Sequence, residues 1–362
     1  MTTQQAASQG FPTIRPATLS RLAAFAGPCV TLTLPGRHPG APEASPRVQA
    51  KGLLDAALAG HTDAAWAGKA RKAVEDFLTN SVPAGGAPGL AILANENGVE
   101  CFQSAIASAH AAAGQTPHIV SLLEPAAVAQ ELWILALSTK HLKLFEYADG
   151  AASAVPLPAT VPANLDAAGH FHTGTVPGQG RSGGPGGVPF GRSGERESAH
   201  DSIEHYCAMI DHGLHSVLAG RPLLLMGVKE EIAAYRRVSH YDSLLAAEVD
   251  GNVEYLTPAQ IAEKAQAAAR DEYLRLGQAI LAEFREMRDR ARALDDPHAV
   301  LEAAVAGRVH NVCVRAGTEL AGPGGDVLNA IAVETIRKGG MAYVLPQQDM
   351  PVTQTVCAIL RY

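Results

Sequence analysis

A glycine-rich, basic segment lies in the middle of the chain, between His172 and His200, and reads HTGTVPGQGRSGGPGGVPFGRSGERESAH. Its arginines are Arg181, Arg192 and Arg196, and its first acidic residue is Glu195. So much glycine does not pack into a core, whereas arginine side chains bind phosphate oxygens through several N–H donors. The chain has a net charge of -7, so any contact with a nucleic acid must come from a local basic patch. The plain alternative is a linker, which segments rich in Gly, Ser and Pro often form.

The composition describes a soluble globular protein with a substantial core. The 362 residues suit two or three domains, and 47% of them are hydrophobic while 18% are charged. The cysteines lie far apart, without a CxxC pair, which predicts reduced thiols buried as small apolar side chains. They are Cys29, Cys101, Cys207, Cys313 and Cys357.

No targeting or membrane-spanning segment is expected from the sequence. The N-terminal stretch MTTQQAASQG has neither the basic nor the apolar region of a secretory signal. No apolar run approaches the ~18 residues of a transmembrane helix. We therefore expect a cytoplasmic protein with no membrane partner.

The first block of the chain, residues 12–124, is predicted to be an N-terminal α/β domain. Its motif PCVTLTLP (Pro28–Pro35) is typical of a strand, and two segments of helical periodicity follow. LAILAN and VECFQ, separated by the turn-like ENG, predict a β-hairpin.

The second block, residues 125–256, contains the Gly-rich loop at 172–194. Two strands joined by a tight turn, ELWILALS and HLKLFEY, precede that loop. Apolar residues at spacings of three and four predict an amphipathic helix after it: Ile203, Tyr206, Ile210, Leu214 and Val217. RPLLLMGV (Arg221–Val228) is a short apolar run typical of a buried parallel strand that leads into a helix.

The third block, residues 257–362, begins with a long helix. Thr257, Pro258 and Gln260 are the residue types of an N-cap, a first helical position and a capping box. An apolar stripe continues to Leu294, and the helix is expected to stop at Asp295–Pro297. Helices and strands then alternate, which predicts a C-terminal αβα sandwich. The fold class is therefore α/β.

The order of these parts carries a family resemblance. The strand pair LWILALS and LKLFE is followed by a Gly-rich loop with Gln, an amphipathic helix, the strand LLLMG, a long helix, and the C-terminal stretch DVLNAIAVETIRKGGMAYVLPQQDMPVTQTVCAILRY. This resembles the bacterial archaeo-eukaryotic release factor family (baeRF), in particular its family 3, relatives of the archaeal and eukaryotic class-I release factor, Pelota and Balon. The resemblance implies a three-domain, release-factor-like architecture, with an RNase H-like middle domain before the C-terminal sandwich.

The resemblance also implies a role for Gly178 and Gln179. In the archaeal and eukaryotic release factors, a Gly-Gly-Gln loop enters the peptidyl-transferase centre, and its Gln helps to position water against the ester of peptidyl-tRNA. Glycine lets backbone N–H groups approach the reacting carbonyl, and a neutral amide orients water without a formal charge. Here Pro177 stands in place of the first Gly. Proline lacks an N–H and fixes φ near −65°, so the departure puts hydrolysis in doubt.

Two kinds of partner follow from the resemblance. The flanking arginines are expected to contact rRNA phosphates, as basic residues do in that family. The C-terminal domain of the relatives meets a translational GTPase, so an elongation-factor-Tu-like partner is expected here. On the helix GDVLNAIAVETIRKGG, Val327, Ile331 and Ile336 are expected in the core. The opposite face would then be free to meet that partner through Asn329, Glu334, Arg337 and Lys338.

No metal site, other cofactor or DNA partner is expected. One predicted helix is crowded with possible ligands, although a solvated helix face explains them better: His200, Asp201, Glu204, His205, Asp211, His212 and His215. RSGGPGG lacks the GK[ST] ending of a phosphate-binding P-loop. No carboxylate set suited to metal-dependent cleavage is visible, which disfavours a nuclease or another hydrolase.

The leading interpretation is a ribosome-associated translation factor that occupies the A site in rescue, hibernation or termination-like release. Its alternative is an active peptidyl-tRNA ester hydrolase that uses the Gly-Gln loop. Whether the protein is an enzyme stays open, because the sequence offers Gln179 for hydrolysis and Pro177 against it.

Overall fold

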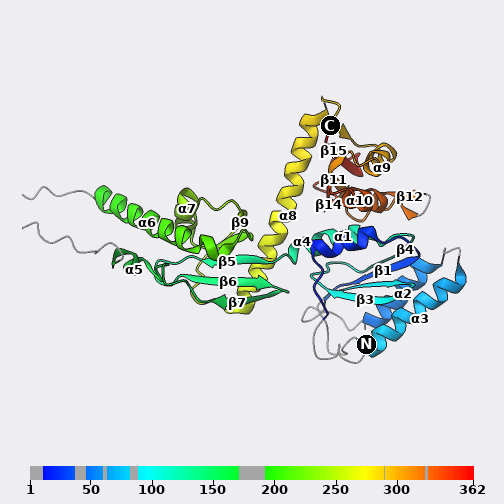
Figure 1. The fold of residues 1–362 in the computed structure, drawn as a ribbon, viewed down its shortest axis with the longest axis horizontal. Coiled ribbons are helices and arrows are strands. Elements are labelled where there is room, and N and C mark those ends of the chain that lie inside the picture. Colours follow the sequence, from blue (N-terminus) through cyan, green and yellow to red (C-terminus); the bar gives the residue numbers. More distant parts are fainter. Residues whose placement is uncertain are drawn as a thin grey trace, which may run out of the picture. The chain divides into compact units, whose positions relative to one another are not determined.

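The computed structural model describes residues 11–36, 46–59, 63–81, 89–170, 192–288, 290–322 and 325–362, with only the backbone described for 46–47, 170 and 192–201. The chain divides into two compact units (Figure 1). Unit 1 combines Met1–Gln130 with Tyr273–Tyr362, and unit 2 is Glu131–Glu272. Within the described ranges, no helix has both the length and the apolar character needed to cross a membrane.

The N-terminal part of unit 1 is an antiparallel sheet of order β3-β2-β1-β4 with helices on both faces. Its elements are α1 (Pro16–Ala24), β1 (Cys29–Leu34), α2 (Pro46–Leu58), α3 (Ala64–Asn80), β2 (Leu90–Asn95), β3 (Gly98–Gln103), β4 (His110–Gly114) and α4 (Val120–Val128). Val30, Leu32 and Leu34 face the core shared with α2 and α3, while Cys29 faces the core of α1 and α4. Every residue of β1 is therefore buried.

The predicted strand at Pro28–Pro35 and the predicted hairpin are confirmed as β1 and as the β2–β3 pair. The sequence did not reveal β4 or α4. Four of the five β4 residues are Ala or Gly, HAAAG, and α4 contains Pro125, so neither segment has an ordinary propensity pattern.

The C-terminal part of unit 1 has three layers, as the sequence predicted. Its elements are the end of α8 (Pro258–Arg288), β10 (Ala293–Leu294), α9 (Pro297–Val305), β11 (Val309–Arg315), β12 (Ala321–Gly322), β13 (Gly325–Asp326), α10 (Val327–Arg337), β14 (Met341–Leu345) and β15 (Val356–Leu360). The sheet order is β10-β15-β11-β14, with β11 parallel to β14 and antiparallel to β15. Val312 and Val314 face α9 and α10, whereas Cys313 faces α8.

The long helix α8 begins as predicted and ends earlier than predicted. Thr257 and Gln260 make the reciprocal bonds of a capping box, with Gln260 N to Thr257 Oγ1 at 3.3 Å and Thr257 N to Gln260 Oε1 at 3.0 Å. The helix ends at Arg288 and not at Asp295. Ala291 has a left-handed φ of 54°, and Ala293–Leu294 pairs with β15 as an edge strand, so sheet pairing overrides the continued apolar stripe.

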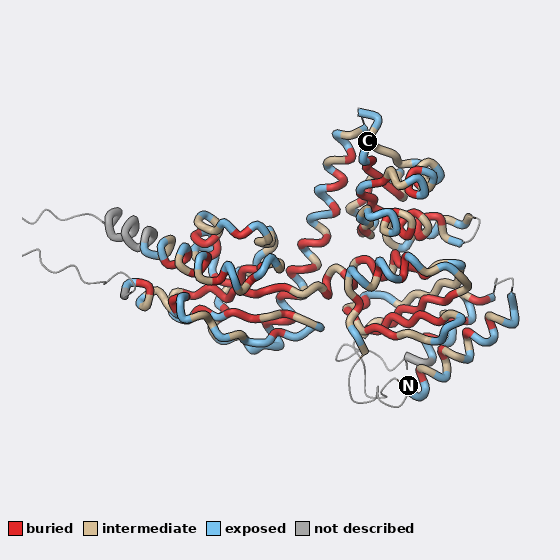
Figure 2. The backbone as a smooth tube through the Cα atoms, in the orientation of Figure 1, coloured by how far each residue is buried: buried red, intermediate tan, exposed pale blue. Residues whose placement is uncertain are grey.

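Unit 2 is built on a five-stranded sheet of order β7-β6-β5-β8-β9. Its elements are β5 (Leu132–Ala136), β6 (Lys143–Ala148), β7 (Ala151–Val155), α5 (Leu165–His170), α6 (Arg192–Leu218), β8 (Leu223–Gly227), α7 (Lys229–Val238) and β9 (Leu244–Asp250), followed by the first part of α8. The predicted antiparallel pair β5–β6 and the predicted parallel strand β8 are both confirmed. Figure 2 shows buried stretches running along the central strands.

Helix α6 is held tightly on this sheet. Apolar side chains spaced along it join the core with α7 and with β5 and β8: Tyr206, Cys207, Ile210, Leu214 and Leu218. Gly213 allows the close approach of the segment before α5, since a Cβ there would lie 2.6 Å from Val161 Cγ2 and 3.4 Å from Thr160 O. The helix that follows the Gly-rich loop is therefore fixed by packing at its C-terminal half.

We predict that Gly213→Ala lowers the free energy of unfolding of unit 2 by about 1–3 kcal/mol, because the stiff Val161 side chain cannot retreat without repacking. The matched control is Gly169→Ala in α5, where a Cβ meets nothing within 4 Å, and where a neutral or slightly stabilising effect is expected. Urea denaturation in a Trp66→Phe background, which leaves Trp133 of unit 2 as the only tryptophan, measures both. Equal stability of the two variants would contradict the close-packing account.

Candidate functional site

The predicted loop residues lie mostly outside the described residues. Gly178, Gln179 and Arg181 all fall there, and so does Pro177. Arg192 and Arg196 lie in the first turns of α6, for which the backbone alone is described. The described chain reaches the loop through α5, which ends at His170, and leaves it through α6. Because Leu165 and Ala168 of α5 share a core with Leu214 of α6, both ends of the loop are attached to packed helices.

The carboxylate and histidine residues of α6 do not gather into a metal site among the side chains that are described. Asp211 is buried and is a structural acceptor instead. It receives hydrogen bonds from Tyr235 Oη at 3.0 Å, Ser239 Oγ at 2.6 Å and the His240 N–H at 3.1 Å. Burial, and then the Asp211 charge, raises the pKa of Tyr235, so this phenol stays a donor.

The prediction that one face of α10 is free to meet a partner is wrong in part. Asn329 is 5% exposed and lies in an interface within unit 1. Its Oδ1 accepts from the N–H groups of Ile119 at 2.8 Å and Val120 at 3.3 Å, and its Nδ2 donates to Pro117 O at 3.0 Å. A helical wheel shows which residues share a face but not whether a second element covers that face, and here α4 and α1 do.

The other three residues of that face are not buried. Arg337 is exposed, yet it donates to Ala23 O through Nη2 at 2.7 Å and through Nε at 3.0 Å, and it pairs with Glu334. Lys338 is exposed. The apolar face is confirmed for Val327 and Ile331, which are buried, while Ile336 is partly buried against the same core.

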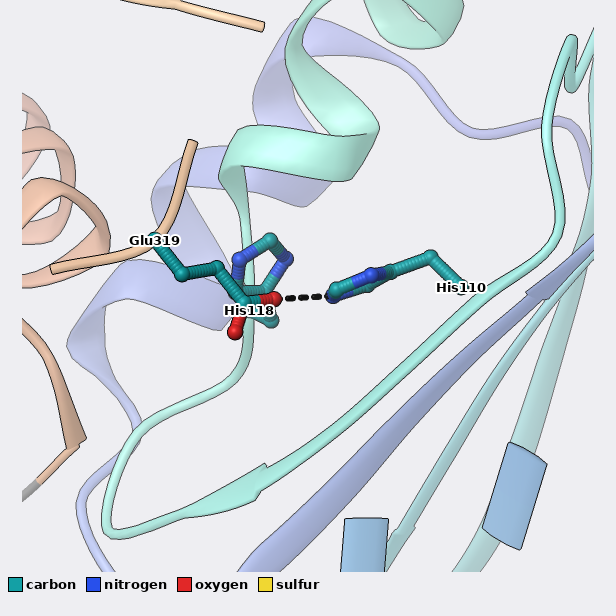
Figure 3. Close-up of side chains that lie close together, drawn as sticks. All are labelled: His110, His118 and Glu319. Atoms are coloured by element: carbon teal, nitrogen blue, oxygen red, sulfur yellow. Dashed lines mark ion pairs between the residues drawn. The ribbon is translucent and has the colours of Figure 1, made fainter. Parts of the chain in front are cut away.

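A polar cluster that sequence reasoning missed lies at the same interface. His110 begins β4, His118 precedes α4, and Glu319 lies in the loop between β11 and β12 (Figure 3). Each offers one ligand atom, and these atoms lie within 4.8 Å of one another. The two imidazole rings are 4.4 Å apart between centroids, and His110 Nε2 lies 3.6 Å from Glu319 Oε1. The residues come from separate segments without a motif spacing, so no sequence signal marks them.

Asp326 adds a second carboxylate next to His118. Its Oδ2 lies 3.8 Å from His118 Nε2, and it caps α10 by accepting from the N–H groups of Leu328 and Asn329. Burial alone would raise the pKa of Asp326, but His118 and the backbone N–H groups of Leu320 and Leu328 outweigh it and hold that pKa below its usual value. The cap therefore stays ionised.

The cluster opens to a pocket of about 490 Å³ lined by His110, His118, Ser121 and Glu319, among other residues. Burial, and then the charge of His118, lowers the pKa of His110. The site thus combines imidazole nitrogens, carboxylates and room for a small molecule.

The cysteines are buried and free of disulfide bonds, as predicted. Burial raises the pKa of the Cys29, Cys101 and Cys207 thiols to about 12, and that of Cys357 likewise. These thiols are apolar packing groups and not nucleophiles.

Comparison with known proteins gives one family. Residues 131–308 match the model for bacterial archaeo-eukaryotic release factor family 3. This segment contains all of unit 2, α8 and the beginning of the C-terminal part. No curated protein matches the chain.

Among solved structures, an archaeal translation termination factor is 14% identical, covering 97% of this chain and 99% of its own, with a TM-score of 0.25. Pelota of Archaeoglobus fulgidus is 10% identical over 75% of this chain and 79% of its own, at a TM-score of 0.35. Ribosome-bound archaeal Pelota is 10% identical over 97% and 95%, at 0.39. Likenesses at these TM-scores carry no functional weight, so the family match is the finding on which a functional proposal rests.

We predict that Asn329→Ala lowers the free energy of unfolding of unit 1 by at least about 3 kcal/mol. Two buried N–H groups and one buried carbonyl lose their partner, at about 1–3 kcal/mol for each unsatisfied group. Chemical denaturation with hydrogen exchange at the Ile119 and Val120 amides measures the effect, and Lys338→Ala on the exposed part of α10 is the control. Equal unfolding curves and unchanged exchange at those two amides would refute the capping role.

Proposed function

We propose that this chain acts on the ribosome as a translation factor, because residues 131–308 match the model for bacterial archaeo-eukaryotic release factor family 3. The Gly-rich loop at 172–194 falls inside the matched segment. In this proposal the middle domain, residues 125–256, presents that loop to ribosomal RNA, and the domains at 12–124 and 257–362 precede and follow it in the sequence. A factor that acts on ribosomes in this way would be located in the cytoplasm.

The packing of unit 2 supports the use of the loop as a contact element. The loop is bounded by α5 and by the 27-residue helix α6, and both share a core with the sheet. A Gly-rich segment tethered at both ends searches less space than a free tail, so Arg181 within it loses less entropy on binding, while Arg192 and Arg196 lie in the first turns of α6. Arg181, Arg192 and Arg196 supply the positive charge that phosphate oxygens require.

We propose that the protein occupies the A site and releases little peptide, as in hibernation or occlusion. Hydrolysis of a peptidyl-tRNA ester needs a water molecule aimed at the carbonyl carbon and N–H donors aimed at the oxyanion. Gly178 and Gln179 have the residue types for this, but Pro177 has no N–H to give. Peptidyl-tRNA hydrolysis by Gln179 is the second candidate, favoured by the Gly-Gln dipeptide itself.

A translational GTPase of the elongation-factor-Tu type is the proposed protein partner of the C-terminal domain. With Asn329 buried, the candidate surface on α10 shrinks to Glu334, Arg337 and Lys338. Arg337 already serves the interface with α1, so Lys338 is the residue of that set whose side chain is best placed for a partner.

We predict that replacing Arg181, Arg192 and Arg196 with Ala weakens ribosome binding and flattens its dependence on salt. Each phosphate contact removed lowers the slope of log K against log[salt] by about one. Sedimentation with 70S ribosomes over a salt series measures both the affinity and the slope.

The matched control removes the same charge from exposed positions elsewhere, by replacing Lys140, Lys229 and Lys264 with Ala. A loss of slope in the loop variant alone supports the anchor. Equal slopes in the two variants would show that net charge alone causes the effect. Unchanged affinity and slope in the arginine variant would refute the proposal that this loop binds RNA.

We predict that the wild-type protein binds stalled ribosomes with slow peptide release, that Gln179→Ala leaves binding intact, and that Pro177→Gly raises release. The physical reason is that Pro177 has no backbone N–H to donate to the oxyanion. One well-placed oxyanion donor raises the hydrolysis rate by a factor on the order of 10²–10³. Single-turnover release from a ribosome carrying peptidyl-tRNA measures the three proteins side by side. Fast wild-type release that Gln179→Ala abolishes, with binding unchanged, would establish the hydrolase instead.

A further inference from the structure

The cluster of His110, His118 and Glu319 in unit 1 has the composition and spacing of a zinc site. Tetrahedral Zn²⁺ with ligand bonds of about 2.0–2.1 Å keeps its ligand atoms about 3.4 Å apart. His110 Nε2 and Glu319 Oε1 are 3.6 Å apart, and all three ligand atoms lie within 4.8 Å of one another. Small side-chain rotations would bring the three ligand atoms to the spacing that one ion requires.

Hydrogen bonding identifies which nitrogen of His118 is available. Ser121 Oγ donates its single hydrogen to His118 O at 3.0 Å, and the same Oγ lies 3.2 Å from His118 Nδ1. With its hydrogen already used, Oγ accepts from Nδ1, so Nδ1 carries the proton and Nε2 carries a lone pair. A histidine that donates its other ring N–H to a neighbour in this way is the usual arrangement of a metal ligand.

Each of the two imidazoles faces a carboxylate at a distance longer than a hydrogen bond. His118 Nε2 is 3.8 Å from Asp326 Oδ2, and His110 Nε2 is 3.6 Å from Glu319 Oε1. Both distances are longer than the usual ~2.7–3.2 Å range of an N–H···O bond. His110 Nε2 is buried and has no hydrogen-bond partner, which is costly for a polar atom.

We propose that His110, His118 and Glu319 bind Zn²⁺, with Asp326 supplying further negative charge beside His118. Two imidazole nitrogens and one carboxylate oxygen favour Zn²⁺ over the hard cations Mg²⁺ and Ca²⁺, which take oxygen ligands. The fourth position faces the 490 Å³ pocket that all three residues line, where a water molecule completes the tetrahedron.

The ion would link two parts of unit 1 that are far apart in sequence. His110 and His118 come from the N-terminal part, and Glu319, which is 60% exposed at its side chain, comes from the C-terminal part. Binding would draw the loop between β11 and β12 onto β4 and the start of α4. The inference is independent of ribosome binding, which concerns the loop in unit 2.

The experiment is a titration of the full chain, purified without a polyhistidine tag and treated with a chelator, with Zn²⁺ alone in competition with a chromophoric chelator. One equivalent per chain is expected to bind. His110→Gln is expected to lower the affinity at least 100-fold. Ser121→Ala, which frees the His118 ring without removing a ligand, is expected to lower it about 10-fold.

The matched control is His310→Gln, an exposed histidine on β11 outside the cluster, and it is expected to bind like wild type. Co²⁺ in place of Zn²⁺ is expected to give the visible absorption of a tetrahedral site in wild type and in His310→Gln, but not in His110→Gln. Far-UV circular dichroism checks that each variant is folded. Failure of wild type to bind one equivalent, or equal loss in His110→Gln and His310→Gln, would overturn the proposal.

Discussion

Unit 1 depends on the bonds that the buried side chain of Asn329 makes to the beginning of α4. The N-cap position of α4 is Ile119, whose side chain offers no acceptor, so the first N–H groups of the helix need a partner from elsewhere. Asn329 supplies that acceptor from α10 and gives its amide hydrogen to Pro117 O. An apolar residue at this position would leave three backbone groups buried without partners. The cap of one helix thus fixes how the N-terminal and C-terminal parts meet in one core.

The same contact explains why a polar cluster persists in an apolar interface. Asp326 caps α10 and so orients the turn that carries Asn329, while His118 sits beside both and is held by its own N–H bonding to Thr31 Oγ1 at 2.9 Å. These hydrogen bonds to the backbone of residues 117–119 hold His118 in place inside the interface. Its imidazole is therefore kept against His110 and the two carboxylates, where a positive ion is the group that satisfies all of them.

The sequence predicted the elements whose pattern is local and failed where partners come from far along the chain. The stripe of α6, the capping box of Thr257 and the apolar run of β8 each follow from spacing alone, and the structure confirms them. The role of Asn329 could not be predicted, because a polar residue on a helix face has the same pattern whether solvent or α4 covers it. His110 lies in the weak strand HAAAG, so neither its element nor its neighbours could be foreseen. The early end of α8 depends on pairing with β15, a contact between segments that periodicity does not report.

Binding and hydrolysis place different demands on the Gly-rich loop, and this difference favours a binding role. Charge attraction to phosphates extends over about 8 Å at physiological salt, so arginine side chains tolerate shifts in backbone position when they bind phosphates. Ester hydrolysis loses about 10²-fold for a misplacement of 1 Å, and it therefore needs a loop whose conformation is fixed by its own backbone. Unit 2 holds α5 and the C-terminal half of α6 in its core, and an electrostatic anchor needs no finer positioning. Pro177 supplies no N–H donor, so any hydrolytic activity would depend on contacts with the ribosome that position Gln179.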